Sequence, residues 1–346
     1  MLKIYTDSNF LNPKNRKIVF PLLFDLHFIP NASSNHLYKI ISNINDADIV
    51  IVPVDINYFY SNEKDKIWLN NFIDNALSLK KIVWIYTAGD YGITIDKDVY
   101  TFRASGFESK LNYKTFILPS FINNPYDGKL GISFQPILKD PRPTIGFVGN
   151  ANGSIKKYIS EYVLYLRYCA KRFFKIIHTD AQFFYPSSCK RYNFLKKLQH
   201  NKAIKTNFIF RDKYRAGVKK ESEKTKTTLE FYQNIQDNPY IFCLRGAGNF
   251  SVRFYETLAM GRIPVVIKSD FRLPMHEQID WSKHCLLLDK LNFESKFIDF
   301  HNNISKEHFI KMQSDNLILW NEFLSREPYF EKIHTIFKNK ILRGDD

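Results

Sequence analysis

The stretch FCLRGAGNFSVRFYETLAMGRIPVVI (242–267) reads as a strand, a glycine turn, a helix and a second strand. Apolar residues run unbroken to Leu244, return at helical spacing over 251–260, and become β-branched again in RIPVVI (262–267). This order predicts a buried parallel strand whose carboxyl end opens into a turn. Ligands of α/β proteins bind at such strand ends.

The turn itself is suited to a phosphate group. Gly246 and Gly248 let the backbone approach a ligand closely, and Asn249 lies between them and the helix. The helix that begins near Ser251 presents unpaired N–H groups and a positive dipole end. We therefore expect an anion site here.

Three charged residues flank this turn. Arg245 and Arg253 supply guanidinium forks that match a diphosphate, and Glu256 follows Arg253 by three positions on the same helix face. A carboxylate there could accept hydrogen bonds from ribose hydroxyls. Two other interpretations stay open: a surface Arg–Glu pair beside an ordinary turn, and a partial dinucleotide fingerprint with Asp270 as its acid, which would indicate an NAD-dependent dehydrogenase.

The rest of the chain repeats the alternation of strand and helix, which predicts an α/β fold of two Rossmann-like domains. The expected strands are 2–6, 47–54, 81–90, 115–122, 143–150, 238–244 and 262–267, and the expected helices are 65–79, 156–175, 251–260 and 305–325. The proline-rich segment 123–143 reads as a linker. We place an N-terminal domain at 1–140, a C-terminal domain at 141–304 and a closing helical segment at 305–346.

Composition narrows the class of protein. The 346 residues are 45% hydrophobic, and 50 Lys and Arg stand against 35 Asp and Glu, a formal charge of +15. This excludes a disordered chain and favours anionic partners. The four cysteines form no CxxC pair and predict free thiols. No signal peptide or membrane span is evident, so a cytoplasmic protein is expected.

Two acidic pairs deserve comparison with the DxD motif that holds a metal on a sugar nucleotide. Asp46 and Asp48 precede their strand, and Asp96 and Asp98 lie in a polar loop. Metal-holding carboxylates sit instead at the carboxyl ends of strands. We interpret both pairs as helix caps or solvated charges, and expect no metal site.

At this point the sequence resembles the exostosin-like glycosyltransferases. The resemblance lies in RG followed by the helix SVRFYE (251–256) and then GRIPVVI (261–267). Weaker pieces follow the same order: DADIVIVPV (46–54), AGDYG (88–92), ILPS (117–120) and RPTIGFVG (142–149). Together they run from about residue 40 to 285.

The resemblance implies a GT-B fold, with a nucleotide sugar held mainly by the C-terminal domain. It also implies an inverting transfer without a bound metal or other cofactor, in which cations and helix N-termini stabilise the leaving diphosphate. The implied donor contacts, including the turn after 143–150 and the cations that follow NFIF (207–210), are Arg245, Gly246, Gly248, Asn249, Ser251, Arg253, Glu256, Gly149, Asn150, Arg211, Lys213 and Arg215.

An inverting transfer also needs a base from the opposite domain to take the proton of the acceptor hydroxyl. Asp90, at the end of the strand 81–90, is the first candidate. Asp7 is the second and His27 a distant third. The family often has a histidine after the acid of the AGD loop, where this chain has Tyr91. The identity of the base therefore stays open.

Residues 187–226 contain 13 Lys and Arg against three Asp and Glu, with aromatic residues interleaved. This segment could be a solvated face, a contact with an anionic acceptor or membrane, or a site for single-stranded nucleic acid. No RNA-binding motif supports the last. We expect a glycosyltransferase that uses a nucleotide sugar, with UDP as the first choice of nucleotide, in the synthesis of a surface polysaccharide or lipopolysaccharide. The competing class is a glycan- or nucleic-acid-binding module without chemistry.

Overall fold

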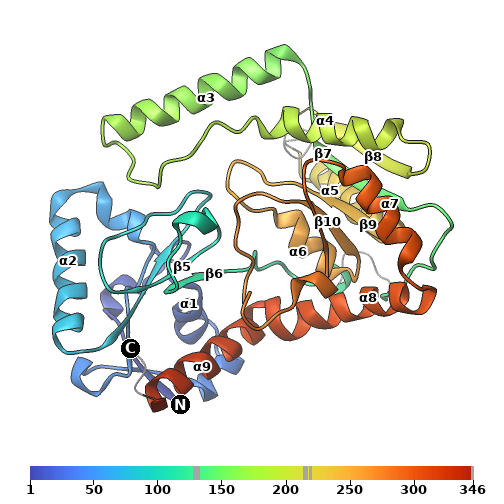
Figure 1. Ribbon diagram of the computed structural model, residues 1–346. Helices are drawn as coiled ribbons and strands as arrows, with labels where there is room; N and C mark the ends of the chain where they lie inside the picture. Colours follow the sequence, from blue (N-terminus) through green and yellow to red (C-terminus); the bar gives the residue numbers. More distant parts are fainter. Residues whose placement is uncertain (128–132, 213–216, 218–219, 344–346) are drawn as a thin grey trace.

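The first of two parallel sheets is built from the N-terminal third of the chain (Figure 1). The computed structural model describes residues 1–127, 133–212, 217 and 220–343. Six strands lie in the order β2-β1-β3-β4-β5-β6. They are β1 (Leu2–Tyr5), β2 (Tyr38–Ile41), β3 (Ile49–Ile51), β4 (Ile82–Thr87), β5 (Tyr100–Arg103) and β6 (Thr115–Ile117), with helices α1 (Pro21–Phe28) and α2 (Glu63–Ser78) beside them.

Strand β3 shows why this segment folds as it does. All three of its residues are fully buried, as the apolar run at 47–54 predicts for a strand covered on both faces. The strand is shorter than that run because the chain leaves the sheet after Ile51. Val54 then forms an antiparallel bridge with Val19, and the Pro53 carbonyl accepts the Phe20 N–H at 3.0 Å.

The second sheet has five parallel strands in the order β11-β10-β9-β7-β8. They are β7 (Thr144–Asn150), β8 (Lys205–Arg211), β9 (Tyr240–Cys243), β10 (Ile263–Ile267) and β11 (Leu286–Leu288). The helices among them are α3 (Ile155–Phe173), α4 (Ser187–His200), α5 (Glu221–Asp237), α6 (Val252–Ala259) and α7 (Phe293–Asn303). The predicted strand–turn–helix–strand stretch is β9, α6 and β10.

Both sheets share one topology. In each, the second strand pairs on one side of the first, and the third strand pairs on its other side. In the first sheet the chain thus adds β2 on one side of β1 and all later strands on the other side. The second sheet is built in the same way around β7. This is the doubly wound order whose switch point opens a crevice for ligands. The expected pair of Rossmann-like units is confirmed.

The end of the chain returns to the first sheet. After α8 (Lys306–Leu319) and a π-helical stretch (Trp320–Leu324), helix α9 (Arg326–Arg343) packs beside this sheet (Figure 1). The Tyr38 hydroxyl donates to the Phe330 carbonyl at 2.7 Å, and the Tyr329 hydroxyl to the Ile117 carbonyl at 3.1 Å. The C-terminal helix therefore packs back as expected, while the boundaries at 140 and 304 stay predictions.

The two units meet through loops that follow their strands. Arg272, after β10, donates to Glu108, after β5, at 2.6 and 2.9 Å. Asn249, after β9, donates to the Gly106 carbonyl at 2.9 Å. Because these loops all leave carboxyl ends of strands, the two ligand-binding edges face each other.

The thiols and the helices agree with two further expectations. All four cysteines are free, and Cys189, Cys243 and Cys285 are buried. None of the helices in the described part of the chain combines the length and the apolar character that crossing a bilayer requires.

We expect Phe337→Ala to destabilise the fold by roughly 3–5 kcal/mol, because it empties a large buried volume. Phe337 is fully buried, with its ring 4.5 Å from Trp84 and 4.8 Å from Tyr100. Urea unfolding would measure the loss, with the exposed neighbour in Lys338→Ala as the control. Equal stabilities of the two variants would show that α9 contributes nothing to the first sheet.

Candidate functional site

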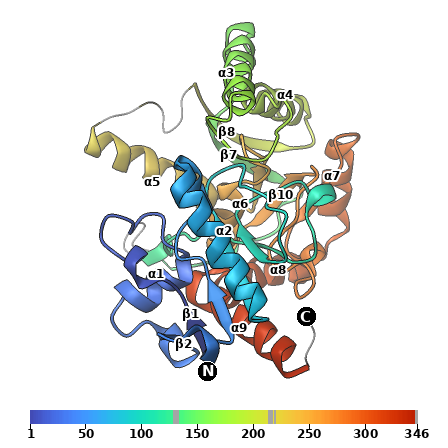
Figure 2. The ribbon, with the colours of Figure 1, turned by 90° about the vertical axis from the view of Figure 1, so that its left-hand side faces the viewer.

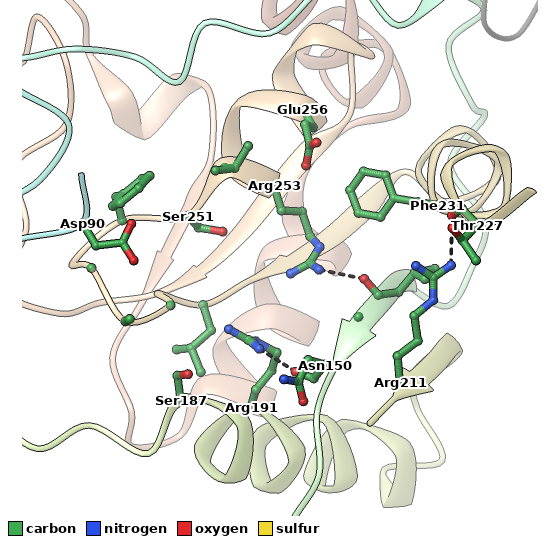
Figure 3. A pocket seen from close by; sticks show the side chains of 18 of the residues that line it. Asp90, Asn150, Ser187, Arg191, Arg211, Thr227, Phe231, Ser251, Arg253 and Glu256 are labelled. Carbon is green, nitrogen blue, oxygen red and sulfur yellow. Dashed lines mark hydrogen bonds between the residues drawn. The ribbon is translucent and has the colours of Figure 1, made fainter. Parts of the chain in front are cut away.

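A cavity of about 650 Å³ opens where the second sheet faces the first unit (Figure 3). The walls come from the ends of β7 and β9, the start of α6, helix α5, helix α4 and the loop after β4. Nine of the residues predicted from sequence line it: Asp90, Gly149, Asn150, Arg211, Gly246, Gly248, Ser251, Arg253 and Glu256. The switch point of the second sheet is therefore hollow.

The glycine turn forms the floor at the start of α6. The Gly246 N–H donates to the Phe250 carbonyl at 3.1 Å, which closes the bend. A Cβ on Gly246 would meet no atom within 4 Å, so this backbone faces open space. A Cβ on Gly248 would come within 2.6 Å of the Asp90 carbonyl oxygen. Ser251 precedes α6 without a side-chain cap, which leaves the helix N-terminus open to the cavity.

Arg253 lies in the first turn of α6 and reaches across to β7. Its Nη2 donates to the Val148 carbonyl at 2.7 Å, and its guanidinium lies 4.3 Å from the centre of the Phe147 ring. Gly149 makes room for it, because a Cβ there would be 2.7 Å from Nη2. Burial lowers the pKa of this guanidinium from its usual value.

A second buried cation, Arg191 of α4, was not predicted. Its Nη1 donates to the Asn150 carbonyl at 2.5 Å and its Nη2 to the Arg245 carbonyl at 3.3 Å. Burial, and then the nearby charge of Arg253, lower the pKa of Arg191 to about 10. Figure 3 shows the guanidinium groups of Arg191 and Arg253 directed toward the same space.

These two cations have no acidic partner in a salt bridge within the described part of the chain. The Nε atoms of Arg191 and Arg253 are also buried without a hydrogen-bond partner among the described residues. A buried charge is costly unless it is compensated. An anion bound between the two guanidinium groups would supply that compensation.

The position of Arg191 leaves a trace in the sequence. Ser188, Leu195 and Leu198 are the buried side of α4, and Arg191 lies three residues after Ser188 and four before Leu195. Helical spacing puts it on that buried side. An arginine on the apolar side of a helix is the signal that could have found it.

Two predicted donor residues brace the turn instead of lining the cavity. The Arg245 guanidinium lies 4.5 Å from the centre of the Tyr185 ring, and donates to the Ala247 carbonyl at 3.0 Å. Asn249 donates to the Gly106 carbonyl and accepts from the Ser269 hydroxyl at 2.8 Å. Both side chains therefore hold the turn against neighbouring segments.

The far wall of the cavity carries Arg211 and helix α5. Arg211 donates to the Thr227 carbonyl at 2.9 Å and forms an ion pair with Glu230. Thr227 and Phe231 face the cavity from α5, a helix that the sequence pattern did not predict. Lys213 and Arg215 lie outside the described residues.

Asp90 enters the cavity from the first unit, in the loop after β4. Its backbone carbonyl accepts the Ser105 hydroxyl at 2.5 Å, which fixes the loop. The surrounding protein raises the pKa of the Asp90 carboxyl by desolvation. In the described residues its carboxylate forms no hydrogen bond or ion pair. Figure 3 shows it beside Ser251, at the end of the cavity away from Arg211.

The other candidate bases lie elsewhere. The Asp7 carboxylate accepts the Asn9 N–H at 3.0 Å as the cap of a short helix, and it does not line the cavity. His27 is exposed on α1 and is likewise absent from the cavity walls. Asp270, the acid of the dehydrogenase interpretation, accepts the Ser109 N–H at 3.0 Å outside the cavity.

The acidic pairs have local partners. Asp48 accepts the Lys3 N–H at 2.7 Å, Asp46 accepts from the Asn43 amide at 3.0 Å, and Asp98 pairs with Lys114 at 2.5 Å. Over residues 1–127, 133–212, 217 and 220–343, no three His, Cys, Asp or Glu side chains gather in a group that could hold a metal ion.

The basic segment 187–226 does not form a single face in its described residues. Arg191 and Arg211 turn into the cavity, Lys205 pairs with Asp140 at 2.7 Å, and Lys196 donates to Gln199 at 2.9 Å. The predicted membrane contact through this segment has no support in these contacts.

The comparisons with solved structures give weak likenesses. A glycosyltransferase from Rickettsia africae is 13% identical, with a TM-score of 0.41 over 99% of this chain and 98% of that chain. The protein HepE of Anabaena, solved with UDP-glucose, is 9% identical, with a TM-score of 0.35 over 99% of both chains. Because both TM-scores are low, we base no argument on them. No curated protein matches the chain.

The family comparison is more informative. The exostosin GT47 domain matches residues 187–300, which run from the first residue of α4 into α7. This span contains the glycine turn, α6 and both buried arginines. The weaker pieces of resemblance before residue 150 lie outside it. The family model thus covers less than half of the chain, and over this part, which builds most of the cavity, the chain is similar to the exostosin-like glycosyltransferases.

Proposed function

We propose that this protein is a glycosyltransferase that takes a sugar from a nucleoside diphosphate sugar bound in the cavity and transfers it with inversion to a glycan acceptor. The observation that carries the proposal is the pair of half-buried arginines, Arg191 and Arg253, that line the cavity beside the open N-terminus of α6. UDP is the first nucleotide to test. We place the acceptor in surface polysaccharide or lipopolysaccharide synthesis in the cytoplasm.

The arginines and α6 bind the diphosphate in this proposal. When the bond between the anomeric carbon and the diphosphate oxygen breaks, the oxygen keeps the electron pair and gains negative charge. Arg191, Arg253 and the backbone N–H groups at the start of α6 are fixed before the reaction and directed at that charge. This electrostatic stabilisation is why we propose a transfer that needs no metal ion.

Glu256 and α5 hold the nucleoside. Glu256 lies one helical turn beyond Arg253 and lines the cavity, so its carboxylate is placed to accept from ribose hydroxyls. Phe231 offers an aromatic face on the opposite wall, and Thr227 and Thr228 line the same wall. A base stacked on Phe231 would extend the diphosphate site into a nucleotide site.

Asp90 acts as the base. It comes from the first unit and lies beside Ser251, at the start of the donor helix. Its carboxylate takes the proton of the acceptor hydroxyl while that oxygen bonds to the anomeric carbon and the diphosphate departs. The raised pKa makes the carboxylate a stronger proton acceptor than an exposed aspartate.

We expect Arg191→Met and Arg253→Met each to weaken UDP binding about 10- to 100-fold, the effect of losing a charge-assisted hydrogen bond. Isothermal titration calorimetry would measure it. Arg142→Met is the matched control, since Arg142 is exposed and donates to the Lys202 carbonyl at 3.1 Å, away from the cavity. Wild-type UDP affinity in both Arg191→Met and Arg253→Met would show that these arginines do not bind the diphosphate.

Glu256→Ala should show whether Glu256 contacts the ribose or the diphosphate of the donor. If its carboxylate contacts the ribose, the variant loses about tenfold in UDP affinity and keeps its affinity for inorganic pyrophosphate, which lacks a ribose. Competition between the two ligands in the same titration gives both values. A parallel loss of both affinities would place Glu256 at the diphosphate.

Asp90→Asn should lower turnover about 10²- to 10⁴-fold with nearly unchanged UDP affinity. Because the pKa of Asp90 is raised, the wild-type rate should fall with decreasing pH through a value above the ordinary aspartate pKa of about 4, and this acid limb should vanish in the variant. UDP release from a panel of UDP-sugars with glycan acceptors reports the rate. Asp7→Asn tests the second candidate, and a loss there instead would move the base.

The same panel separates the enzyme from a binding module. Nucleotide binding without release of UDP from any sugar and acceptor combination would favour a protein that kept the fold and lost the chemistry.

A further inference from the structure

Helix α3 leaves an apolar surface uncovered. None of its 19 residues is buried, although one side of it is lined by Ile155, Ile159, Tyr162, Leu166 and Phe173. Ile155 is 78% exposed and Phe173 81% exposed. At 1.5 Å per residue the helix is about 28 Å long. In a soluble protein the apolar side of a helix normally packs against the core. The stripe of α3 is exposed instead.

Basic residues border the stripe. Lys156 and Arg167 are exposed on one side of it at helical spacing, and Lys171 is exposed further round the helix in the same direction. The single acid of the helix, Glu161, points away from the stripe and accepts the Ser188 N–H at 3.2 Å. The exposed surface of α3 therefore combines apolar side chains with positive charge alone.

The helix is held firmly from its other side. The Tyr168 hydroxyl donates to the Asp180 carbonyl at 2.5 Å, and Arg172 Nε donates to the Thr179 carbonyl at 2.7 Å. Asp180 in turn pairs with Arg103 of the first unit at 2.8 Å. Figures 1 and 2 show α3 at the outer edge of the molecule, away from both sheets. The stripe thus belongs to a fixed element with free access.

We propose that this face of α3 lies flat on an anionic lipid bilayer. A helix with an apolar side and a lysine- and arginine-rich border inserts its apolar side at the boundary of headgroups and acyl chains, and its cations bind lipid phosphates. The formal charge of +15 draws the whole chain to such a surface. A second copy fits less well, because pairing two stripes brings like charges together.

The same helix contacts the catalytic loop of the proposed function. The Tyr168 ring lies 5.0 Å from the ring of Tyr91, the residue after Asp90. A bilayer under α3 would therefore lie on the acceptor side of the cavity, where a lipid-linked glycan could reach it. The bilayer contact does not depend on the proposed sugar transfer, so the vesicle experiment tests it separately.

The experiment is sedimentation of the protein with vesicles of phosphatidylcholine alone or mixed with phosphatidylglycerol. We expect binding to the anionic vesicles that weakens with salt. The double variant Ile159→Ser, Leu166→Ser should lose about tenfold or more in affinity, since two apolar side chains no longer leave water. Arg167→Glu with Lys171→Glu should abolish the preference for phosphatidylglycerol.

Matched controls come from surfaces far from α3. Ile318→Ser removes an exposed apolar residue of α8, and Lys338→Glu reverses an exposed charge of α9; both should bind like the wild type. Thermal unfolding confirms that each variant is folded. Wild-type vesicle binding by the Ile159, Leu166 variant would overturn the proposal. An absence of vesicle binding by the wild type would overturn it as well. If the wild type is then a dimer in ultracentrifugation and the variant is a monomer, the stripe pairs two copies of the chain instead.

Discussion

Two positive charges, which form no salt bridge with an acidic residue in the described part of the chain, organise the ligand-binding edge of the second sheet. Arg253 crosses from α6 to the end of β7, and Arg191 crosses from α4 to the same strand end. Their backbone hydrogen bonds satisfy part of each guanidinium, and the nearby carboxylates of Glu161 and Glu256 offset the two charges in part. The turn, Gly149 and the loop after β4 are arranged around these two groups, so the cavity is a site that a negatively charged ligand completes.

The local part of this arrangement could be predicted from sequence. The order of strand, glycine turn and helix at 242–267 follows from apolar spacing and turn residues, and β9, α6 and β10 agree with it within two residues. The roles of Gly246 and Arg253 follow from their positions relative to a helix start. These inferences need no knowledge of distant parts of the chain.

The rest depends on contacts between segments far apart in sequence. Arg245 adjoins the turn as predicted, but its guanidinium packs on the Tyr185 ring and does not line the cavity. Arg191 belongs to the basic run 187–226, and only its spacing from Leu195 and Leu198 on the apolar side of α4 distinguishes it from the other cations of that run. Helix α5 has no apolar residue before Leu229, so its sequence shows only a weak apolar pattern, and the wall that it provides was missed.

The path of the chain also limits how the two units can move. They are joined once by the segment between β6 and β7, and a second time where α8 passes into α9 and returns to the first sheet. Any rigid-body closing of one unit on the other must bend both crossings together.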